Sequence, residues 1–301
     1  MFPRLLPIVS AISLAFPLVA TATVTTYDEN TILSNVQKGL LASQGNTVNY
    51  YGETIKVSSY QWAGCGGSGQ TQNSVLNVGK NGYTKLVDLK ASWDQEHQKS
   101  PIGLLALGNK DKYGPKVSVN AETVKIYAEV DSQASADANG IAAQNGTYDS
   151  SLDKNARAQI SINADNIYID ARSNSTELPF KRANAIFAIS QGMVDIEGNL
   201  YVNTQGGNGQ AIQTRGGAII NINQSGKHTV QLNGDIAFGY AGNSQTPIDA
   251  DVNILLNGKD SYWKGNSTVI WSSNADPEKL TIEKKSEFGL KQWGSMGANC
   301  C

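Results

Sequence analysis

Residues 117–128 read VSVNAETVKIYA, and residues 160–171 read ISINADNIYIDA. The two stretches lie 43 residues apart, and their apolar positions coincide along the whole length without a gap. Residues 194–202, VDIEGNLYV, form a third copy that is one residue shorter at its centre. Apolar and polar residues alternate in the first part of each copy. Small polar residues typical of a turn interrupt the alternation, which then resumes. The pattern predicts two β-strands joined by a turn in every repeat.

A third short apolar element follows each pair of strands. Residues 139–143 match residues 184–188 and, more weakly, residues 209–212. One repeat of three strands has too few inward apolar side chains for a core, but stacked repeats bury a continuous apolar column. The sequence therefore predicts an all-β fold, a single-stranded right-handed parallel β-helix (solenoid) with three short strands per coil, in which Val119 and Ile162 stack. A sandwich or barrel of short strands is the alternative, but it does not predict a gapless repeat. Further segments continue the rhythm at residues 76–78, 86–89, 103–106, 220–222, 230–232, 252–254, 269–270 and 280–282.

The predicted β-helix spans residues 71–290, and residues 291–301 are expected to be a truncated or disordered tail. Residues 23–70 are less regular and are expected to hold an N-terminal cap and the first irregular coils. Within them Thr54–Trp62 is typical of a strand, whereas Thr31–Ser43 could be a short helix or a cap that covers the sheet edge.

Corners between strands carry the insertions and the asparagines. Residues 132–137 and 173–181 are expected to be corner loops. Asn120 and Asn163 occupy equivalent turn positions, where asparagine suits left-handed conformations and amide stacking between coils.

The N-terminal segment has the features of a secretory signal peptide over residues 1–22. Arg4 supplies the positive charge, Leu5–Val19 are uncharged and apolar, and Ala20–Ala22 offer a small-residue cleavage site. A single-pass membrane helix is the competing interpretation, but the run is short for a bilayer and holds two prolines.

The composition excludes several classes of protein. The 301 residues carry 24 basic and 26 acidic side chains, a net charge of -2, which argues against nucleic-acid binding through a basic surface. With 28 Asn, 30 Gly and only 17% charged residues, the chain is not an all-helical protein.

No residue is predicted to bind a metal or a cofactor or to act in catalysis. Only His97 and His228 are available, and the sequence has no CxxC motif, which excludes the usual zinc sites. Cys65 stands in a glycine-rich loop, and the adjacent Cys300 and Cys301 are expected to be passive thiols with it. Residues 64–69 match GxGxxG by letter but precede no helix. Residues 206–212 resemble a calcium-binding GGxGxDx repeat, with Ala211 in place of the ligand aspartate.

Acidic residues are the candidates for an enzymatic alternative, because glycan cleavage needs convergent carboxylates. They are Glu122, Asp165, Asp170 and Asp195. Glu122 and Asp165 occupy equivalent corners and should lie side by side at a solvated turn, whereas Asp165 and Asp170 are expected on opposite faces of a regular strand.

Residues 251–267, DVNILLNGKDSYWKGNS, add a local signature: a strand, a short turn, an aromatic–Trp pair and then x-Gly at Gly265. With the signal peptide, the Asn- and Gly-rich coils and the few cysteines, the chain resembles over residues 70–290 the passenger region of bacterial autotransporters, the pertactin-like β-helices of type V secretion. The resemblance implies export through the periplasm to the surface of a Gram-negative cell. It also implies an outer-membrane β-barrel translocator, for which this sequence has no segment after the last coil.

The expected role is therefore a non-enzymatic, adhesin-like binding or display module without a cofactor. Its partner would be a protein or glycan on a host or neighbouring cell. A secreted β-helix polysaccharide lyase or hydrolase is the second hypothesis, and a structural component of the cell surface is the third.

Overall fold

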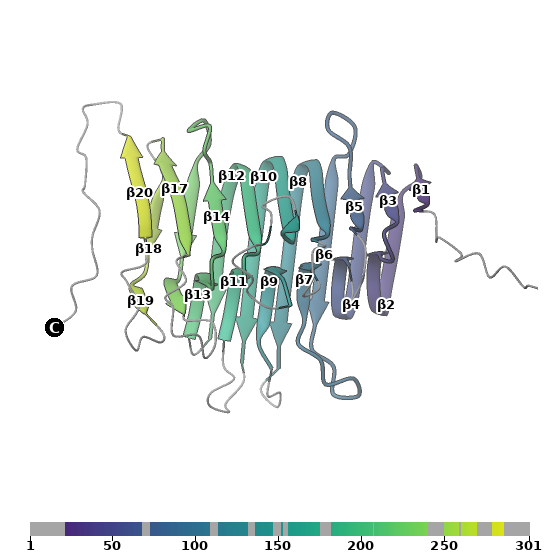
Figure 1. Cartoon of the computed structure of the whole chain (residues 1–301), viewed down its shortest axis with the longest axis horizontal. Helices are drawn as coiled ribbons and strands as arrows, with labels where there is room; N and C mark the ends of the chain where they lie inside the picture. The colour runs from purple at the N-terminus through teal and green to yellow at the C-terminus, as the bar shows by residue number, and fades with distance from the viewer. Residues whose placement is uncertain are drawn as a thin grey trace, which may run out of the picture.

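The computed structural model describes residues 22–67, 73–108, 114–131, 136–146, 152, 156–174, 182–206, 208–239, 250–258, 260–269 and 279–285. In these residues the regular structure is β-strand, with no α-helix. Every strand pairing among them is parallel. Figure 1 shows the strands stacked along one long axis, with β1 at one end and β20 at the other. The predicted parallel β-helix is thus confirmed.

Each coil has three sides, which we call the first, second and third side in chain order. The first side holds β1 (Val24–Tyr27), β3 (Thr47–Tyr50), β5 (Val75–Val78), the starts of β8 (Lys116–Val130), β10 (Gln159–Ser173) and β12 (Met193–Gln205), then β14 (Ile219–Ile222), β17 (Asp251–Asn257) and β20 (Lys279–Lys285). The second side holds the starts of β2 (Thr31–Ala42) and β4 (Thr54–Gly66), β6 (Leu86–Ser92), the ends of β8, β10 and β12, β15 (Val230–Asn233) and β18 (Tyr262–Lys264).

The third side completes each coil and carries the ends of the two earliest long strands. It holds the ends of β2 and β4, β7 (Ile102–Leu107), β9 (Ala138–Gln144), β11 (Arg182–Ile189), β13 (Asn208–Arg215), β16 (Asp235–Gly239) and β19 (Ser267–Val269).

The repeat in the sequence is the coil in the structure. β8 and β10 pair from Val117 beside Ile160 to Ala128 beside Ala171, and Val119 lies beside Ile162 as predicted. The third copy drops one residue at the corner between the first and second sides, where the register of β10 against β12 shifts.

Gly198 makes this tighter corner possible. It has φ of 146°, and a Cβ there would lie 2.0 Å from the carbonyl oxygen of Ala164. Only glycine fits such a position without displacing backbone.

The core is a set of inward columns that run the length of the rod. Two columns on the second side consist of buried aliphatic residues. One runs from Val87 to Val124, and the other from Leu89 to Ile126. Burial of each such side chain contributes about 1.5–3 kcal/mol. The column through Leu89 continues with Ile126, Ile169 and Val202.

The third side is buried on both of its faces, which the sequence analysis did not anticipate. Ile141 and Ile186 point into the core, and the residues that follow them, Ala142 and Phe187, are also buried although they face outward. The outward residues form a second apolar cluster with Leu105. The signal was present in the short uninterrupted apolar runs of β9 and β11, which are typical of strands covered on both faces.

Two expectations for the N-terminal part were wrong. Residues 31–42 form strand β2, a rung paired with β4, and not a helix. Cys65 lies in strand β4, not in a loop, and is fully buried. The sequence of β2 contains leucines and has a weak local preference for helix. Its pairing with the regular strand β4 outweighs this preference.

Asparagines stack between coils, but not where the sequence suggested. Asn120 and Asn163 pair in register inside β8 and β10, and neither has the left-handed conformation. The hydrogen-bonded amide ladders lie elsewhere: Thr26–Asn49–Asn77, Asp195–Asn221–Asn253 and Asn139–Asn184.

Parts of several predictions fall outside the described residues. They are most of the signal peptide, the loop residues 132–135 and 175–181, and the tail 291–301.

Candidate functional site

The outer surface of the second side carries aromatic and charged side chains. Inward residues alternate with outward ones along its strands, and register stacking arranges the outward ones in columns parallel to the long axis. We call the first of these the tyrosine column: Lys56, Asp88, Lys125, Tyr168, Tyr201, Gln231 and Tyr262. The mixed column beside it comprises Ser58, Lys90, Tyr127, Asp170, Asn203, Asn233 and Lys264.

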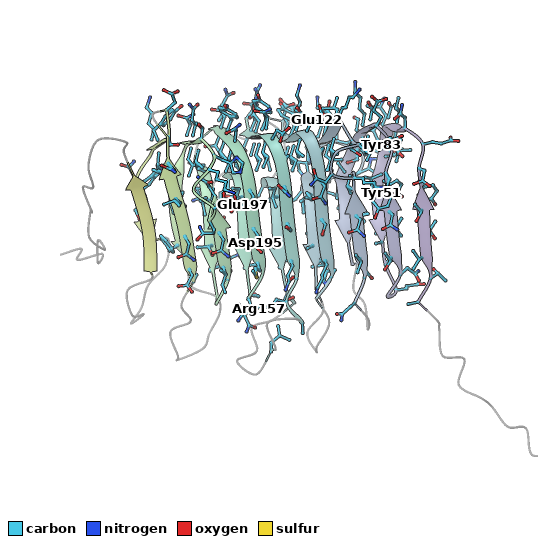
Figure 2. The ribbon with its side chains drawn as sticks, turned by 90° about the horizontal axis from the view of Figure 1, so that it is seen from above. Tyr51, Tyr83, Glu122, Arg157, Asp195 and Glu197 are labelled. Atoms are coloured by element: carbon cyan, nitrogen blue, oxygen red, sulfur yellow. The ribbon has the colours of Figure 1, made fainter. Side chains whose placement is uncertain are left out.

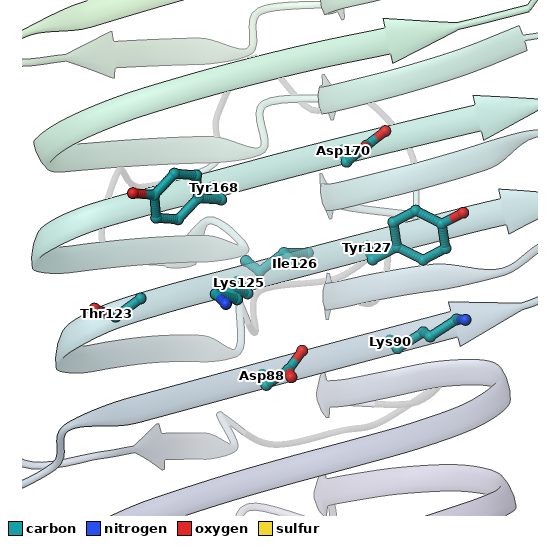
Figure 3. Close-up of a pocket in the computed structure, with 8 residues that line it drawn as sticks. All are labelled: Asp88, Lys90, Thr123, Lys125, Ile126, Tyr127, Tyr168 and Asp170. Carbon is teal, nitrogen blue, oxygen red and sulfur yellow. The ribbon is translucent and has the colours of Figure 1, made fainter.

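An open depression of about 640 Å³ lies between the two columns, over strands β6, β8 and β10. Figure 3 shows Tyr168 and Tyr127 on adjacent strands, with Lys125 on the strand of Tyr127 and next to Tyr168. It is lined by Asp88, Lys90, Thr123, Lys125, Ile126, Tyr127, Tyr168 and Asp170.

Tyr127 is held between two cations. The Lys90 Nζ lies 5.0 Å from its ring centroid on one side, and the Arg172 guanidinium lies 5.3 Å from it on the other. Such contacts each contribute about 0.5–1 kcal/mol at exposed sites. Burial, together with a hydrogen bond to Glu129, raises the pKa of Tyr127 above that of a free phenol, so the ring stays neutral.

Arg172 also neutralises the carboxylate at this edge of the depression. Its Nη2 lies 2.7 Å from Oδ2 of Asp170, and its Nε lies 3.1 Å from Oδ1 of the same residue. The hydrogen bond to Asp170 is the main reason why the pKa of Arg172 is raised. The pair therefore ties Arg172 to the mixed column at Asp170.

The tyrosine column is less constrained and more exposed. The rings of Tyr168 and Tyr201 stack with centroids 5.0 Å apart, and Tyr168 remains 42% exposed. Lys125 is exposed in the rung beside Tyr168, and none of the ion pairs among the described residues involves it. The depression thus offers an aromatic ring and an ammonium group to solvent.

A smaller depression of about 470 Å³ lies at the corner after the first side. Figure 2 shows Asp195 and Glu197 on this side of the coil. Both oxygens of Glu197 are engaged by Ser225, through its backbone N–H at 3.0 Å and its hydroxyl at 2.9 Å. His228 Nε2 lies 3.9 Å from the same carboxylate. Glu197 therefore holds the next corner in place.

Asp195 is half-buried beside that corner. Its Oδ1 accepts a hydrogen bond of 2.7 Å from Asn221, and its pKa is raised mainly by burial and further by the charge of Glu197. Asp195 was among the predicted acidic candidates and Glu197 was not, although the spacing of two carboxylates two residues apart on one strand is visible in the sequence.

The other acidic candidates do not converge. Glu122 and Asp165 are exposed at equivalent corners of adjacent coils, as predicted. The placement of Asp165 and Asp170 on opposite faces was wrong, because the chain turns a corner between them and both side chains lie on the outer surface. Asp170 belongs to the mixed column on the second side.

A group of possible metal ligands occurs near the end of β6. Asp94, Glu96 and His97 offer ligand atoms within 4.8 Å of one another. The Asp94 oxygen already accepts hydrogen bonds from the backbone N–H groups of Glu96 and His97 and contacts Nδ1 of His97 at 2.8 Å. These contacts account for the cluster as a turn held by Asp94, and Tyr60 stacks on His97 with centroids 5.4 Å apart.

The remaining motifs are structural. Gly64 and Gly66 lie inside β4, so this part of the GxGxxG match is not a phosphate-binding loop. Burial raises the pKa of Cys65 to about 12, so its thiol is unreactive at neutral pH. Ala211 is fully buried in β13, where no ligand could reach it.

The tryptophans that the structure describes pack against the rod. Trp62 joins the apolar cluster on the third side, and Trp263 donates its indole N–H to the carbonyl of Gly234 at 3.0 Å. A Cβ at Gly265 would lie 2.1 Å from that same oxygen, which explains the glycine in the aromatic–Trp–x–Gly signature.

No family model, curated protein or solved structure matches this chain. Among the described residues there is also no helix with the length and hydrophobicity needed to cross a membrane.

Proposed function

We propose that this protein is an exported, surface-displayed β-helical rod that binds a linear glycan along its second side. The observation that supports this proposal is the tyrosine column, together with the depression that is lined by Tyr168, Tyr127 and Lys125. Export and display on a Gram-negative cell rest on the predicted signal peptide and on the resemblance to autotransporter passengers.

The shape of the column supports a polymer as the ligand. From Asp88 to Tyr262 it crosses six rungs. At a spacing of about 4.8 Å per rung, these span on the order of 24 Å. The depression is open and does not enclose a compact molecule. A chain that lies along the rod would meet a polar or aromatic group at every rung.

The chemistry of the column supports a sugar more than a protein. Protein interfaces have an apolar core, whereas the large apolar side chains exposed on β6 to β18 of this side are tyrosines, Tyr168 and Tyr262. Tyrosine combines an apolar ring, which can pack against the C–H face of a sugar, with a hydroxyl that hydrogen-bonds. Lys125 and Asp88 add a charged donor and a charged acceptor for sugar hydroxyl or carboxylate groups.

The test is binding of the purified chain to an array of linear glycans, both neutral and uronate-containing, followed by calorimetry on the glycans that are retained. Tyr168→Ala should weaken binding at least tenfold, because it removes the most exposed ring in the depression. Tyr83→Ala is the matched control: Tyr83 is 51% exposed but lies at a corner outside the depression. Cells that display the chain should adhere to a surface coated with the same glycan, and cells with Tyr168→Ala should not.

Three results would contradict the proposal. They are retention of no glycan, equal losses for the two tyrosine variants, and release of new reducing ends from a bound glycan. The last result would favour the alternative of a polysaccharide-cleaving enzyme, for which the observation is the Asp195–Glu197 corner with His228. In that case Asp195→Asn should abolish the release while Tyr168→Ala should not.

A further inference from the structure

The first coil leaves one edge of the sheet open. β1 pairs with β3 through the carbonyls of Thr23 and Tyr27, which accept from the N–H groups of Thr47 and Tyr51. Because backbone groups alternate sides along a strand, Val24 and Thr26 direct theirs to the opposite edge. Among the described residues no strand pairs with that edge.

The side chains of this coil are exposed in the way that a missing neighbour would produce. Tyr27 belongs to an inward column that is fully buried further along, at Val78 and Val119, yet it is 48% exposed. Its ring stacks on that of Tyr50 with centroids 4.9 Å apart, so one flank is covered from within the rod. Thr25 is exposed as well, although it belongs to the inward column in which Leu76 is fully buried.

The opposite end of the rod offers the complementary edge. β20 pairs with β17 and, within the described part of the chain, with nothing on its other side. Figure 1 places β20 and β1 at opposite ends of one parallel stack. Two ends of such a stack have matching hydrogen-bond patterns, because each strand donates and accepts in the same way as the strand before it.

The register and the charges of the two ends also match. Following the columns from rung to rung places Ile282 of β20 in the column of Tyr27, and Thr281 in the column of Thr26. If the same register continued into a second copy, Lys284 would lie opposite Glu29. β20 contains three lysines and one glutamate, whereas Asp28 and Glu29 follow directly after β1 and are exposed.

We propose that copies of this protein associate head to tail, with the outer edge of β20 in one copy adding to the outer edge of β1 in the next. The contact is heterologous and does not close on itself, so it extends the rod in one direction and produces filaments instead of a closed dimer. Tyr27 would become covered on both flanks, and Lys284 of the neighbouring copy would take the register position opposite Glu29.

The experiment is sedimentation velocity of the full exported chain over a range of concentrations, with electron microscopy of the largest species. We expect species larger than the monomer that grow with concentration, with lengths in multiples of one rod. Val24→Pro should weaken association at least tenfold, because it removes a backbone N–H on the open edge while leaving the bonds of β1 to β3 intact. Circular dichroism and an unchanged melting temperature establish that this variant is folded.

A charge exchange keeps the test independent of any loss of fold. Glu29→Lys alone should weaken association, and Glu29→Lys combined with Lys284→Glu should restore it. Asp165→Asn, at an exposed corner in the middle of the rod, should leave it unchanged. A chain that stays monomeric at the highest concentration, association that none of these variants alters, or rods that associate side by side would each overturn the proposal. Glycan binding through Tyr168 is a separate readout, since that residue lies in the middle of the rod.

Discussion

Ile169 lies at the centre of an inward column, between Ile126 in the coil before and Val202 in the coil after, and is 1% exposed. Its neighbour in sequence, Tyr168, points outward. Substitution of Ile169 therefore tests the contribution of the core to stability, and substitution of Tyr168 on the same strand tests the candidate site.

We therefore expect Ile169→Ala to lower the free energy of unfolding by about 2–5 kcal/mol, the usual cost of a cavity in a well-packed core. Tyr168→Ala should lower it by no more than about 1 kcal/mol, because it loses mainly the stacking contact with Tyr201. Urea denaturation followed by circular dichroism measures both. A loss below 1 kcal/mol for Ile169→Ala would contradict the stacked core.

At the scale of a single strand, a carboxylate forms the end of the amide ladder on the first side. Asn253 donates to Asn221, which donates to Asp195, so the ladder ends on the half-buried acid. Burial raises the pKa of Asp195 above its value in the unfolded chain. The folded protein therefore binds this proton more tightly, and the ionised carboxylate costs stability as the pH rises above the ordinary pKa of aspartate.

Asp195→Asn should thus raise the free energy of unfolding at pH 7 by about 0.5–2 kcal/mol. The amide keeps an acceptor for Asn221 and carries no charge to desolvate. The gain should shrink below about pH 4, where Asp195 is protonated in both states. Thermal melts between these pH values measure the difference, with Asp260→Asn at an exposed corner as the control. A destabilising effect at pH 7 would show that the charge of Asp195 strengthens the ladder.

At the scale of the whole molecule, each coil contacts the coils before and after it, as expected for a solenoid. Gln159 and Met193 occupy the same position in successive coils, and so do Ile160 and Val194. Removal of one complete coil should therefore bring equivalent rungs together.

Deletion of residues 159–192, which joins Ala158 to Met193, should give a folded protein that is shorter by about 4.8 Å. Its strand signal in circular dichroism should persist, and small-angle scattering should report the shorter rod. Deletion of residues 159–175 is the control, because it removes half a coil and places inward residues of one side over corners of the next. Equal behaviour of the two deletions would contradict the dependence on whole coils. The first deletion removes Tyr168 but brings Tyr201 into its place beside Lys125, so it should shorten the tyrosine column by one rung.

The sequence by itself determined the coil, its three strands and the register of its regular part. Inward residues have a like neighbour in every coil, so the repeat of residues 117–128 at 160–171 fixes which strands lie side by side. The tertiary structure decided what lies on the outside. Lys125 and Tyr168 occupy equivalent positions of the repeat, whereas Asp88 joins their column only through the register of β6 against β8. It also decided that residues 31–42 form a rung and that the third side is buried on both faces. The physical reason lies in two different patterns. The alternation of apolar residues along a strand shows which residues point inward. Which outward residues lie side by side depends in addition on the number of residues at the corners of each coil.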